Sequence, residues 1–312
     1  MFSLWLDFIE RKFLESGDFR KLVEQNIIDG ATSNPAIFQQ AFTKSDSYLQ
    51  QIRELKSRNL SAEQIYEELA ITDIRTTAEQ LLPLYQKGKR GFVSIEVNPF
   101  FADDATNTIE EGKRIFEKIG YPNVMIKIPA TEAGYIAMEK LASLGIPINA
   151  TLIFSLEEAI KSAEAIQKGG GQGVLSIFVS RLDRATSSKH FGIANSSKIY
   201  REITKRNYSN ITPLFASTGV KDSSLPADYY IRELLTPNSI NTAPLKTIEA
   251  YIQSGGGGDV KFPLSPEQEQ KIFEEIEKSY SIEEVLSKLK IDGIEAFKNS
   301  YRDIIAYLDE VE

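Results

Sequence analysis

Short apolar runs alternate with longer amphipathic segments along almost the whole chain. The runs are nearly continuous in apolar residues, which is typical of strands that are buried on both faces of a parallel sheet. Eight strands that alternate with helices favour a closed (β/α)8 barrel, the TIM barrel, over a doubly wound sheet. The expected strands are Ser3–Phe8, Ile27–Thr32, Phe92–Val97, Val124–Pro129, Pro147–Ile153, Val174–Val179, Thr212–Ser217 and Tyr229–Leu234.

The segments between these runs carry helical periodicity. The expected helices are Arg11–Gln25, Ala62–Lys87, Thr108–Ile119, Glu132–Leu144, Ser155–Lys168, Asn195–Lys205, Pro266–Lys278 and Ile282–Glu310. Ser61 with Gln64, and Ser155 with Glu158, predict capping boxes. Pro35–Gly91 is too long for one crossover and predicts two or three helices, whereas the connection between the last two strands is expected to be short. We therefore expect one barrel domain over residues 1–312, with a helical insertion at about 36–90 and C-terminal helices at about 242–312.

The amino-acid composition excludes several kinds of covalent, catalytic and metal site. The 312 residues include no cysteine and one histidine, His190. Disulfides, thiolate nucleophiles, cysteine zinc sites, iron–sulfur clusters and paired-histidine metal sites are therefore excluded. A net charge of −8 disfavours a nucleic-acid partner. No segment resembles a membrane span or a secretory signal, so we expect no membrane partner and a cytoplasmic location. His190 is expected to lie in a surface loop.

Polar side chains interrupt the apolar strands near their carboxyl ends. Buried charges are costly unless they have partners, so such residues need an explanation. The carboxyl ends of barrel strands meet at one mouth, where the catalytic groups of this fold lie. The sequence therefore predicts a polar cluster at that mouth, which contains Asp7, Asn34, Glu96, Lys127, Asn149, Thr151 and Ser176.

Lys127 is the sharpest of these signals, because no other predicted strand contains a lysine. Alternation places Met125 and Lys127 on one face of their strand. Burial disfavours the charged form of an amine, and a neutral amine forms a Schiff base with a carbonyl substrate or with pyridoxal phosphate. Glu96 and Asp7 are then the available proton carriers. The alternative is a purely structural ion pair between Lys127 and Glu96.

Two motifs carry a resemblance to a known family. D-G-A-T-S-N-P at Asp29–Pro35 and I-K-I-P-A-T-E-A-G at Ile126–Gly134 resemble the two signatures of the transaldolases, with Lys127 as the Schiff-base lysine. Further similar segments follow in order from about residue 4 to about residue 310, among them L-W-L-D, S-I-E-V, I-N-A-T-L-I-F, S-I-F-V-S-R-L-D and L-F-A-S-T-G-V-K-D.

The resemblance implies a class I aldolase barrel that uses no metal and no cofactor. Its implied reaction moves a dihydroxyacetone unit from sedoheptulose 7-phosphate to glyceraldehyde 3-phosphate. The products are erythrose 4-phosphate and fructose 6-phosphate, in the pentose phosphate pathway. Phosphorylated sugars are thus the implied partners.

Residue roles also follow from the resemblance. Lys127 would attack the ketose carbonyl, Glu96 would shuttle protons with a water held by Thr151, and Asp7 would take the hydroxyl proton that triggers cleavage. The implied substrate-binding residues are Thr32, Ser33, Asn34, Asn149, Ser176, Phe178, Arg181, Ser217 and Lys221. Arg181 would hold the phosphate. Many relatives have an arginine where this chain reads A-S-T-G-V-K, so Lys221 would supply only a point charge.

Other functions stay open at this stage. A fructose-6-phosphate aldolase, which releases free dihydroxyacetone, would use the same lysine, although such relatives are shorter. A pyridoxal phosphate enzyme is disfavoured because no phosphate cup is evident. A catalytically silent barrel that acts as a binding protein could have filled the strand ends with apolar residues. The chain is expected to be a monomer or a homodimer.

Overall fold

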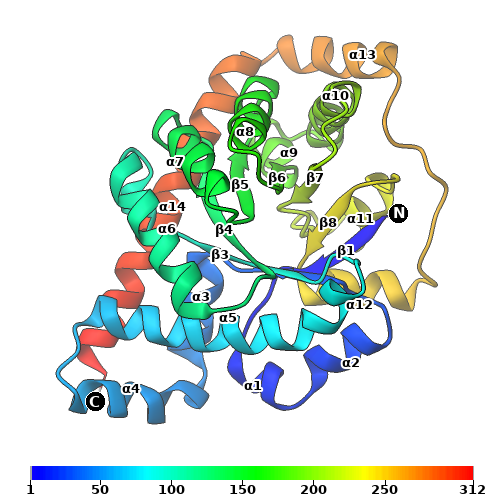
Figure 1. Ribbon diagram of the computed structural model, residues 1–312. Coiled ribbons are helices and arrows are strands. Elements are labelled where there is room, and N and C mark those ends of the chain that lie inside the picture. Colours follow the sequence, from blue (N-terminus) through cyan, green and yellow to red (C-terminus); the bar gives the residue numbers. More distant parts are fainter. Residues whose placement is uncertain (1, 312) are drawn as a thin grey trace.

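The computed structural model describes residues 2–311, and in this part of the chain eight parallel strands close into one barrel. Each strand pairs with the next one in the sequence, and β8 pairs with β1 (Figure 1). The predicted (β/α)8 fold is therefore confirmed. The strands are β1 (Ser3–Leu6), β2 (Gly30–Thr32), β3 (Phe92–Glu96), β4 (Val124–Pro129), β5 (Ile148–Ile153), β6 (Gly173–Phe178), β7 (Ile211–Ala216) and β8 (Ile240–Ala243).

The predicted eighth strand is wrong. Tyr229–Leu234 is rich in aromatic and β-branched residues, but it forms the short helix α11 (Tyr229–Glu233). Asp228 and Arg232 pair across one helical turn at 2.6 Å, which stabilises the helix. The true strand, β8, escaped prediction because Asn241 and Thr242 break its apolar pattern. The connection between the last two strands is consequently longer than expected and includes a helix.

Apart from α11 and shifts of up to four residues at helix termini, the helices differ from the expected ones in two places. The helix expected over Arg11–Gln25 is divided at Gly17, whose φ of 81° belongs to the left-handed region. The short helix α9 was not predicted. The α-helices are α1 (Arg11–Glu15), α2 (Asp18–Glu24), α3 (Pro35–Lys44), α4 (Leu49–Ser57), α5 (Ala62–Gln86), α6 (Ala105–Ile119), α7 (Glu132–Ser143), α8 (Leu156–Lys168), α9 (Ser180–Thr186), α10 (Phe191–Lys205), α11, α12 (Leu245–Gln253), α13 (Pro266–Glu277) and α14 (Ile282–Glu310), and short 3₁₀ turns lie at Asp46–Tyr48 (η1) and Pro99–Phe101 (η2).

Helix termini and the insertion follow the sequence signals closely. Both expected capping boxes form, at Ser61–Gln64 before α5 and at Ser155–Glu158 before α8. Helices α3, α4 and α5 occupy the long segment between β2 and β3, as predicted. The expectation of one domain over residues 1–312 stays a prediction.

The two faces of the strands pack against different partners. Ile126 and Ile128 of β4 belong to the apolar layer between the strands and the outer helices. Met125 belongs instead to the cluster inside the barrel, together with Trp5 and Phe92. This alternation places Lys127 on the inner face, at the end of the strand beyond Met125.

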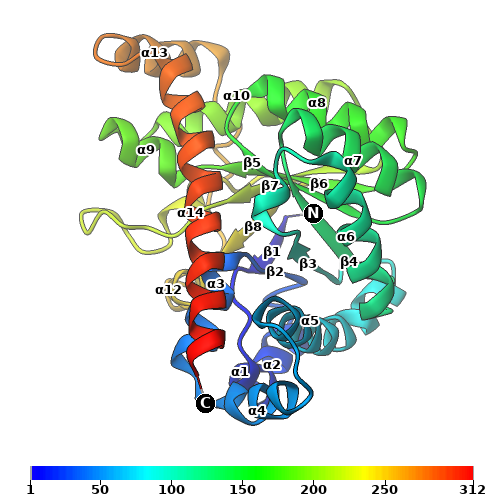
Figure 2. The same cartoon turned by 90° about the vertical axis from the view of Figure 1, so that its left-hand side faces the viewer.

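Helix α14 lies across one end of the barrel (Figure 2). It packs against α3, α5 and α9 and touches β5. Lys290 fixes it there, because its Nζ donates to the Ala130 carbonyl at 2.9 Å and lies 3.1 Å from Glu158 Oε1. Among the described residues, no helix is long and apolar enough to cross a membrane.

The interior packing gives a test of the barrel. A methyl group added at Gly30 would overlap the Trp5 indole, which is fully buried inside the barrel. We expect Gly30→Ala to lower the free energy of unfolding by about 1–3 kcal/mol, as overpacking does. Urea unfolding measures this loss. The double variant Gly30→Ala/Trp5→Phe should recover part of it, because the smaller ring makes room; additive losses in the double variant would contradict the proposed overlap.

Candidate active site

The centre of the candidate site is an ion pair between neighbouring strands. The parallel register sets Glu96 of β3 beside Lys127 of β4, both on the inner face. Lys127 Nζ lies 3.0 Å from Glu96 Oε2, and the two side chains are only 6% and 1% exposed. Nζ also donates to the Ser33 carbonyl at 3.1 Å. The amine is therefore held by two acceptors, while Glu96 Oε1 has no hydrogen-bond partner among the described residues.

Two carboxyl groups near the lysine have raised pKa values. Burial raises the pKa of Glu96, and the charge of Lys127 opposes that effect. Burial at the cavity wall likewise raises the pKa of Asp7, opposed by Lys127 and by a hydrogen bond from Thr32 Oγ1 to Asp7 Oδ1 at 2.6 Å. Both groups thus hold a proton more readily than a surface carboxyl, which suits groups that exchange protons during a reaction.

A cavity of about 480 Å³ opens beside Lys127 at the barrel mouth. This volume suits a small molecule of several heavy atoms. Helices α9 and α14 and the loop after β7 complete its wall. The predicted site residues that line it are Asp7, Thr32, Asn34, Lys127, Ser176, Phe178, Arg181, Ser217 and Lys221.

The other predicted site residues, Ser33, Glu96, Asn149 and Thr151, lie behind this wall. Asn149 Nδ2 donates to Ser94 Oγ at 2.9 Å, and Ser176 Oγ donates to Asn149 Oδ1 at 2.6 Å. Asn149 is thus engaged inside the barrel and fixes Ser176. Thr151 is fully buried, and its hydroxyl has no hydrogen-bond partner in the described part of the chain.

Asn34 has a structural task in addition to its place at the cavity. Its side-chain oxygen accepts from Ile37 N at 3.1 Å and caps α3. An N-cap leaves the amide nitrogen available as a donor. The carbonyl of the preceding residue, Ser33, accepts a hydrogen bond from Lys127. The residues at the start of α3 therefore contact both the lysine and the cavity.

One end of the cavity is cationic. Arg181, Arg184 and Lys221 all line it, and no ion pair engages any of the three within residues 2–311. The Arg181 guanidinium lies over the rings of Phe178 and Phe297, 5.1 and 5.9 Å from their centroids. Burial and the neighbouring charge of Arg184 lower the pKa of Arg181. Such an uncompensated cluster favours a bound anion.

The loop after β7 brings its own polar groups to this end. Ser217 has a φ of 56°, and its Oγ lies 3.1 Å from Ser180 Oγ at the start of α9. Lys221 is exposed, four residues farther along the loop. The aliphatic stem of lysine reaches over such a distance, so Lys221 supplies a mobile charge at the rim rather than a fixed fork.

Comparison with known proteins agrees with this geometry. The family model described as Transaldolase/Fructose-6-phosphate aldolase matches residues 4–308. The chain belongs to the transaldolase/fructose-6-phosphate aldolase family. It is 44% identical to a transaldolase of Campylobacter jejuni subsp. doylei, with 98% of this chain and 99% of the relative covered. A transaldolase of Helicobacter pylori strain P12 is 41% identical over 97% of this chain and 98% of its own length. The resemblance inferred from the two motifs is therefore confirmed.

Several cavity residues were missed from the sequence. Phe297 comes from α14, far from every strand in the sequence, and no local pattern distinguishes it from core. Thr242 was hidden by the wrong eighth strand; its Oγ1 lies 2.6 Å from Thr32 Oγ1. Arg184 had a usable signal, because its spacing of three residues from Arg181 puts both on one helix face.

Two further sequence expectations concern sites elsewhere. His190 is exposed and lies outside the cavity, with its Nδ1 3.2 Å from the Tyr229 hydroxyl, as expected for a surface loop. Residues 2–311 contain no group of three or more histidine, cysteine, aspartate or glutamate side chains placed to hold a metal ion.

The buried pair predicts a pH-dependent stability defect. Lys127→Met leaves the Glu96 carboxyl without its counter-ion, and we expect a loss of about 3–5 kcal/mol in the free energy of unfolding near neutral pH. Lys127 lowers the pKa of Glu96, so its removal raises that pKa further. A raised folded-state pKa gives stability that is present at low pH and lost as pH rises through it. The deficit relative to wild type should therefore be larger at about pH 8 than at about pH 5.

Urea titrations at both pH values measure this difference. The double variant Lys127→Met/Glu96→Gln removes the carboxyl and should show a smaller deficit with a weaker pH dependence, which comes from Asp7, because Lys127 also lowers the pKa of that group. An equal deficit at both pH values in the single variant would show that Glu96 carries no buried charge.

Proposed function

We propose that this chain is a transaldolase that transfers a dihydroxyacetone unit between phosphorylated sugars through a Schiff base on Lys127. The donor is sedoheptulose 7-phosphate, the acceptor is glyceraldehyde 3-phosphate, and the products are erythrose 4-phosphate and fructose 6-phosphate. One observation carries the proposal. A buried lysine held by a buried carboxylate lies at the wall of a cavity whose far end gathers three cations.

Lys127 and Glu96 divide the first step between them. The amine adds to the ketose carbonyl, and the carbinolamine hydroxyl then leaves as water while the nitrogen lone pair forms the C=N bond. Glu96 is the carboxyl nearest to the amine, so it exchanges the protons that this step requires. The free hydroxyl of Thr151 and Glu96 Oε1 are the buried polar groups that would hold the water involved.

Asp7 is the group that exchanges the proton when the carbon–carbon bond breaks and forms. It lines the sugar cavity, whereas Glu96 does not. Thr32 and Thr242 fix its carboxyl through a chain of hydrogen bonds. Asp7 takes the proton of the hydroxyl next to the cleaved bond, the enamine remains on Lys127, and the aldehyde leaves. The same proton returns when the acceptor adds.

Arg181 and its neighbours bind the phosphate. The planar guanidinium offers a fork to two phosphate oxygens and is packed between two aromatic rings. Gly293 of α14 permits this packing, because a methyl group there would lie 3.2 Å from Arg181 Nη1 and 2.9 Å from Leu152. Ser176 and the Asn34 amide are placed for the sugar hydroxyls. Arg184 and Lys221 add charge at the rim.

Sugar phosphates are thus the partners that we propose, and the cytoplasm is the proposed location for their exchange. The cationic end serves a single small phosphate and gives no extended basic surface for a nucleic acid. We keep the expectation of a monomer or homodimer as a prediction, as well as that of one domain over residues 1–312.

Trapping tests the lysine. Incubation with fructose 6-phosphate followed by borohydride should leave a reduced three-carbon adduct on Lys127, detected by mass spectrometry, because the enamine remains after the aldehyde departs. Lys127→Met should give no adduct. Wild type without an adduct, or the variant with an adduct elsewhere in the site, would refute the mechanism.

The same substrates distinguish the two activities in the family description. A transferase turns over fructose 6-phosphate only when erythrose 4-phosphate is present and releases little free dihydroxyacetone. A fructose-6-phosphate aldolase releases dihydroxyacetone without an acceptor. Equal release of dihydroxyacetone with and without acceptor would assign the chain to the lyases.

Arg181 is tested by its selectivity. Arg181→Ala should raise the KM for fructose 6-phosphate about 10- to 100-fold, which corresponds to the loss of a charged hydrogen bond worth roughly 1.5–3 kcal/mol. Labelling of Lys127 by free dihydroxyacetone should change little. Arg206→Ala, at the exposed C-cap of α10, is the control for a lost arginine. Equal losses with both substrates would remove Arg181 from phosphate binding.

A further inference from the structure

A second cavity lies on the other side of the Lys127–Glu96 pair. It encloses about 560 Å³ between α5, α6 and α14, and no residue lines both it and the sugar cavity. Glu96 lines this second cavity, whereas Lys127 lines the sugar cavity. The ion pair is therefore the connection between two separate spaces.

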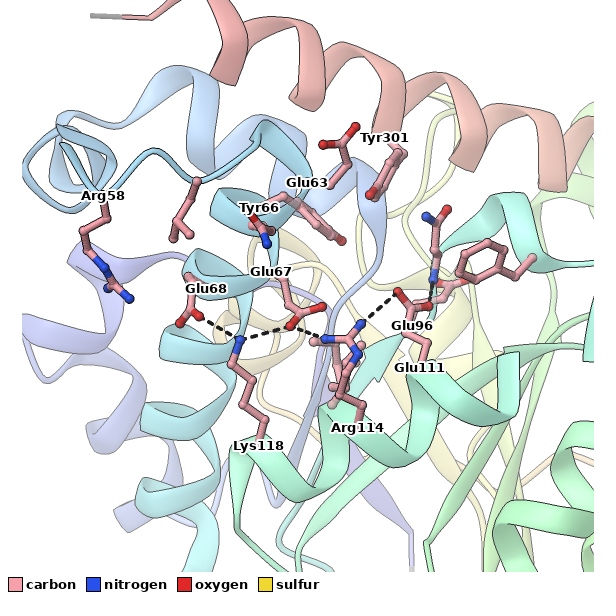
Figure 3. Close-up of a pocket in the computed structure, with 16 residues that line it drawn as sticks. Arg58, Glu63, Tyr66, Glu67, Glu68, Glu96, Glu111, Arg114, Lys118 and Tyr301 are labelled. Carbon is pink, nitrogen blue, oxygen red and sulfur yellow. Dashed lines mark hydrogen bonds and ion pairs between the residues drawn. The ribbon is translucent and has the colours of Figure 1, made fainter. Parts of the chain in front are cut away.

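Most charges around the second cavity are already paired. Glu67 binds both Arg114 and Lys118, and Lys118 also lies 2.7 Å from Glu68 (Figure 3). These contacts join α5 to α6 and form the outer rim. The two carboxylates and two cations in these contacts balance one another, and the polar lining favours water as the occupant.

Two carboxyl groups in the lining differ from the rest. The Glu96 side chain is almost fully buried, and its Oε1 has no hydrogen-bond partner in the described part of the chain. Glu111 Oε2 accepts from the backbone N–H of Asn98 at 2.7 Å, and its distance to Arg114 is 3.8 Å (Figure 3). Burial raises the pKa of Glu111 to about 7. Glu111 therefore changes its protonation near neutral pH.

Tyr66 of α5 lines the same cavity (Figure 3). Its ring packs edge-on against Tyr301 of α14, with centroids 5.0 Å apart. Burial raises the pKa of Tyr66 well above its usual value, and the charges of both Glu96 and Glu111 add to the effect. A phenol that stays protonated is able to donate to an ionised carboxylate and to accept from a protonated carboxyl group.

We propose that this second cavity is the route by which water and protons reach Glu96, with Glu111 as the group that exchanges protons with the solvent. The inference rests on the proposed Schiff-base function. Glu111 acts through Glu96 and touches no reacting atom, so it is a positioning residue for the proton.

The route answers a requirement of the reaction. Glu96 first takes the proton of the Lys127 ammonium, which frees the amine to add to the carbonyl. When the carbinolamine dehydrates, Glu96 passes this proton to the leaving hydroxyl, the C–O bond breaks, and one water is released. Bound sugar fills the other cavity at that moment, so the water departs through the second cavity, where Glu111 keeps Glu96 in proton exchange with the solvent. Hydrolysis of the Schiff base uses the same steps in reverse, with one water consumed.

The electrostatic surroundings of Glu111 come from several elements. Arg114 on α6 favours its charged form, and Glu67 on α5 opposes it. The remaining titratable or charged groups that line this cavity are Arg58, Glu63, Tyr66, Glu68, Glu96, Lys118 and Tyr301. Glu111 is the lining carboxyl whose pKa burial raises to about 7, so a transition near neutral pH is expected from it.

The test is the pH dependence of Schiff-base formation in Glu111→Gln. The rate with fructose 6-phosphate, followed by quenching with borohydride, should show a transition near pH 7 in wild type. In Glu111→Gln this transition should disappear, and the rate should fall by about tenfold, less than the loss of a direct acid–base group. The amount of adduct after long incubation should equal that of wild type, which shows that the sugar site is intact.

Controls separate the possible failures. Glu110→Gln changes an exposed neighbour on α6 and should keep the wild-type profile. Tyr66→Phe keeps the ring packing and should slow the reaction as Glu111→Gln does; it also replaces Glu111→Gln as the test if that variant does not fold. A wild-type pH profile and rate in either folded variant would overturn the route while the proposed function stands. Wild type without any adduct would overturn the proposed function itself.

Discussion

The structure is organised around one buried ion pair. Lys127 and Glu96 are brought together by the register of two central strands, where water cannot solvate either charge. A single buried charge there would be strongly unfavourable, but the pair and the Ser33 carbonyl satisfy the amine. The hydrogen bonds from Ser94 through Asn149 to Ser176 fill the rest of this level of the barrel. These polar side chains stay enclosed because the barrel is closed, because α3 begins beside them and because α14 packs across the barrel mouth.

Two carboxyl groups with raised pKa values occupy different surroundings around the same lysine. Asp7 is half-buried on the sugar side, whereas Glu96 is almost fully enclosed and faces the second cavity. Environments that separate two titratable groups also separate their roles. Asp7 is placed to act on the substrate, and Glu96 is placed to act on the nitrogen and on water. The chain has no cysteine, and its one histidine lies at the surface. The proton transfers at the site therefore depend on carboxyl groups.

The sequence predicts the parts of this arrangement that depend on strand patterns. A lysine or glutamate is conspicuous inside a continuous apolar run. Because all the strands run in the same direction, such residues near the strand ends lie together at one mouth of the barrel. The pattern failed at β8, where Asn241 and Thr242 interrupt a strand of four residues. It also could not predict that Phe297 and Gly293 reach the site, because the docking of α14 depends on tertiary contacts such as those of Lys290. The second cavity lies between α5, α6 and α14, and no single segment of the sequence encodes it.

The C-terminal helix explains how the site combines exclusion of water with access to it. On one side α14 brings Phe297 over Lys127 and Arg181, with the Lys127 amine 5.6 Å from the ring centroid, so the sugar cavity is closed by an apolar group. On the other side the same helix contributes Tyr301 to the polar second cavity. An enamine on Lys127 must be kept from water until the acceptor arrives, yet its formation and release both require water. Separate routes for sugar and for water on the two sides of one ion pair reconcile these needs, and the position of α14 between them makes both routes depend on a single helix.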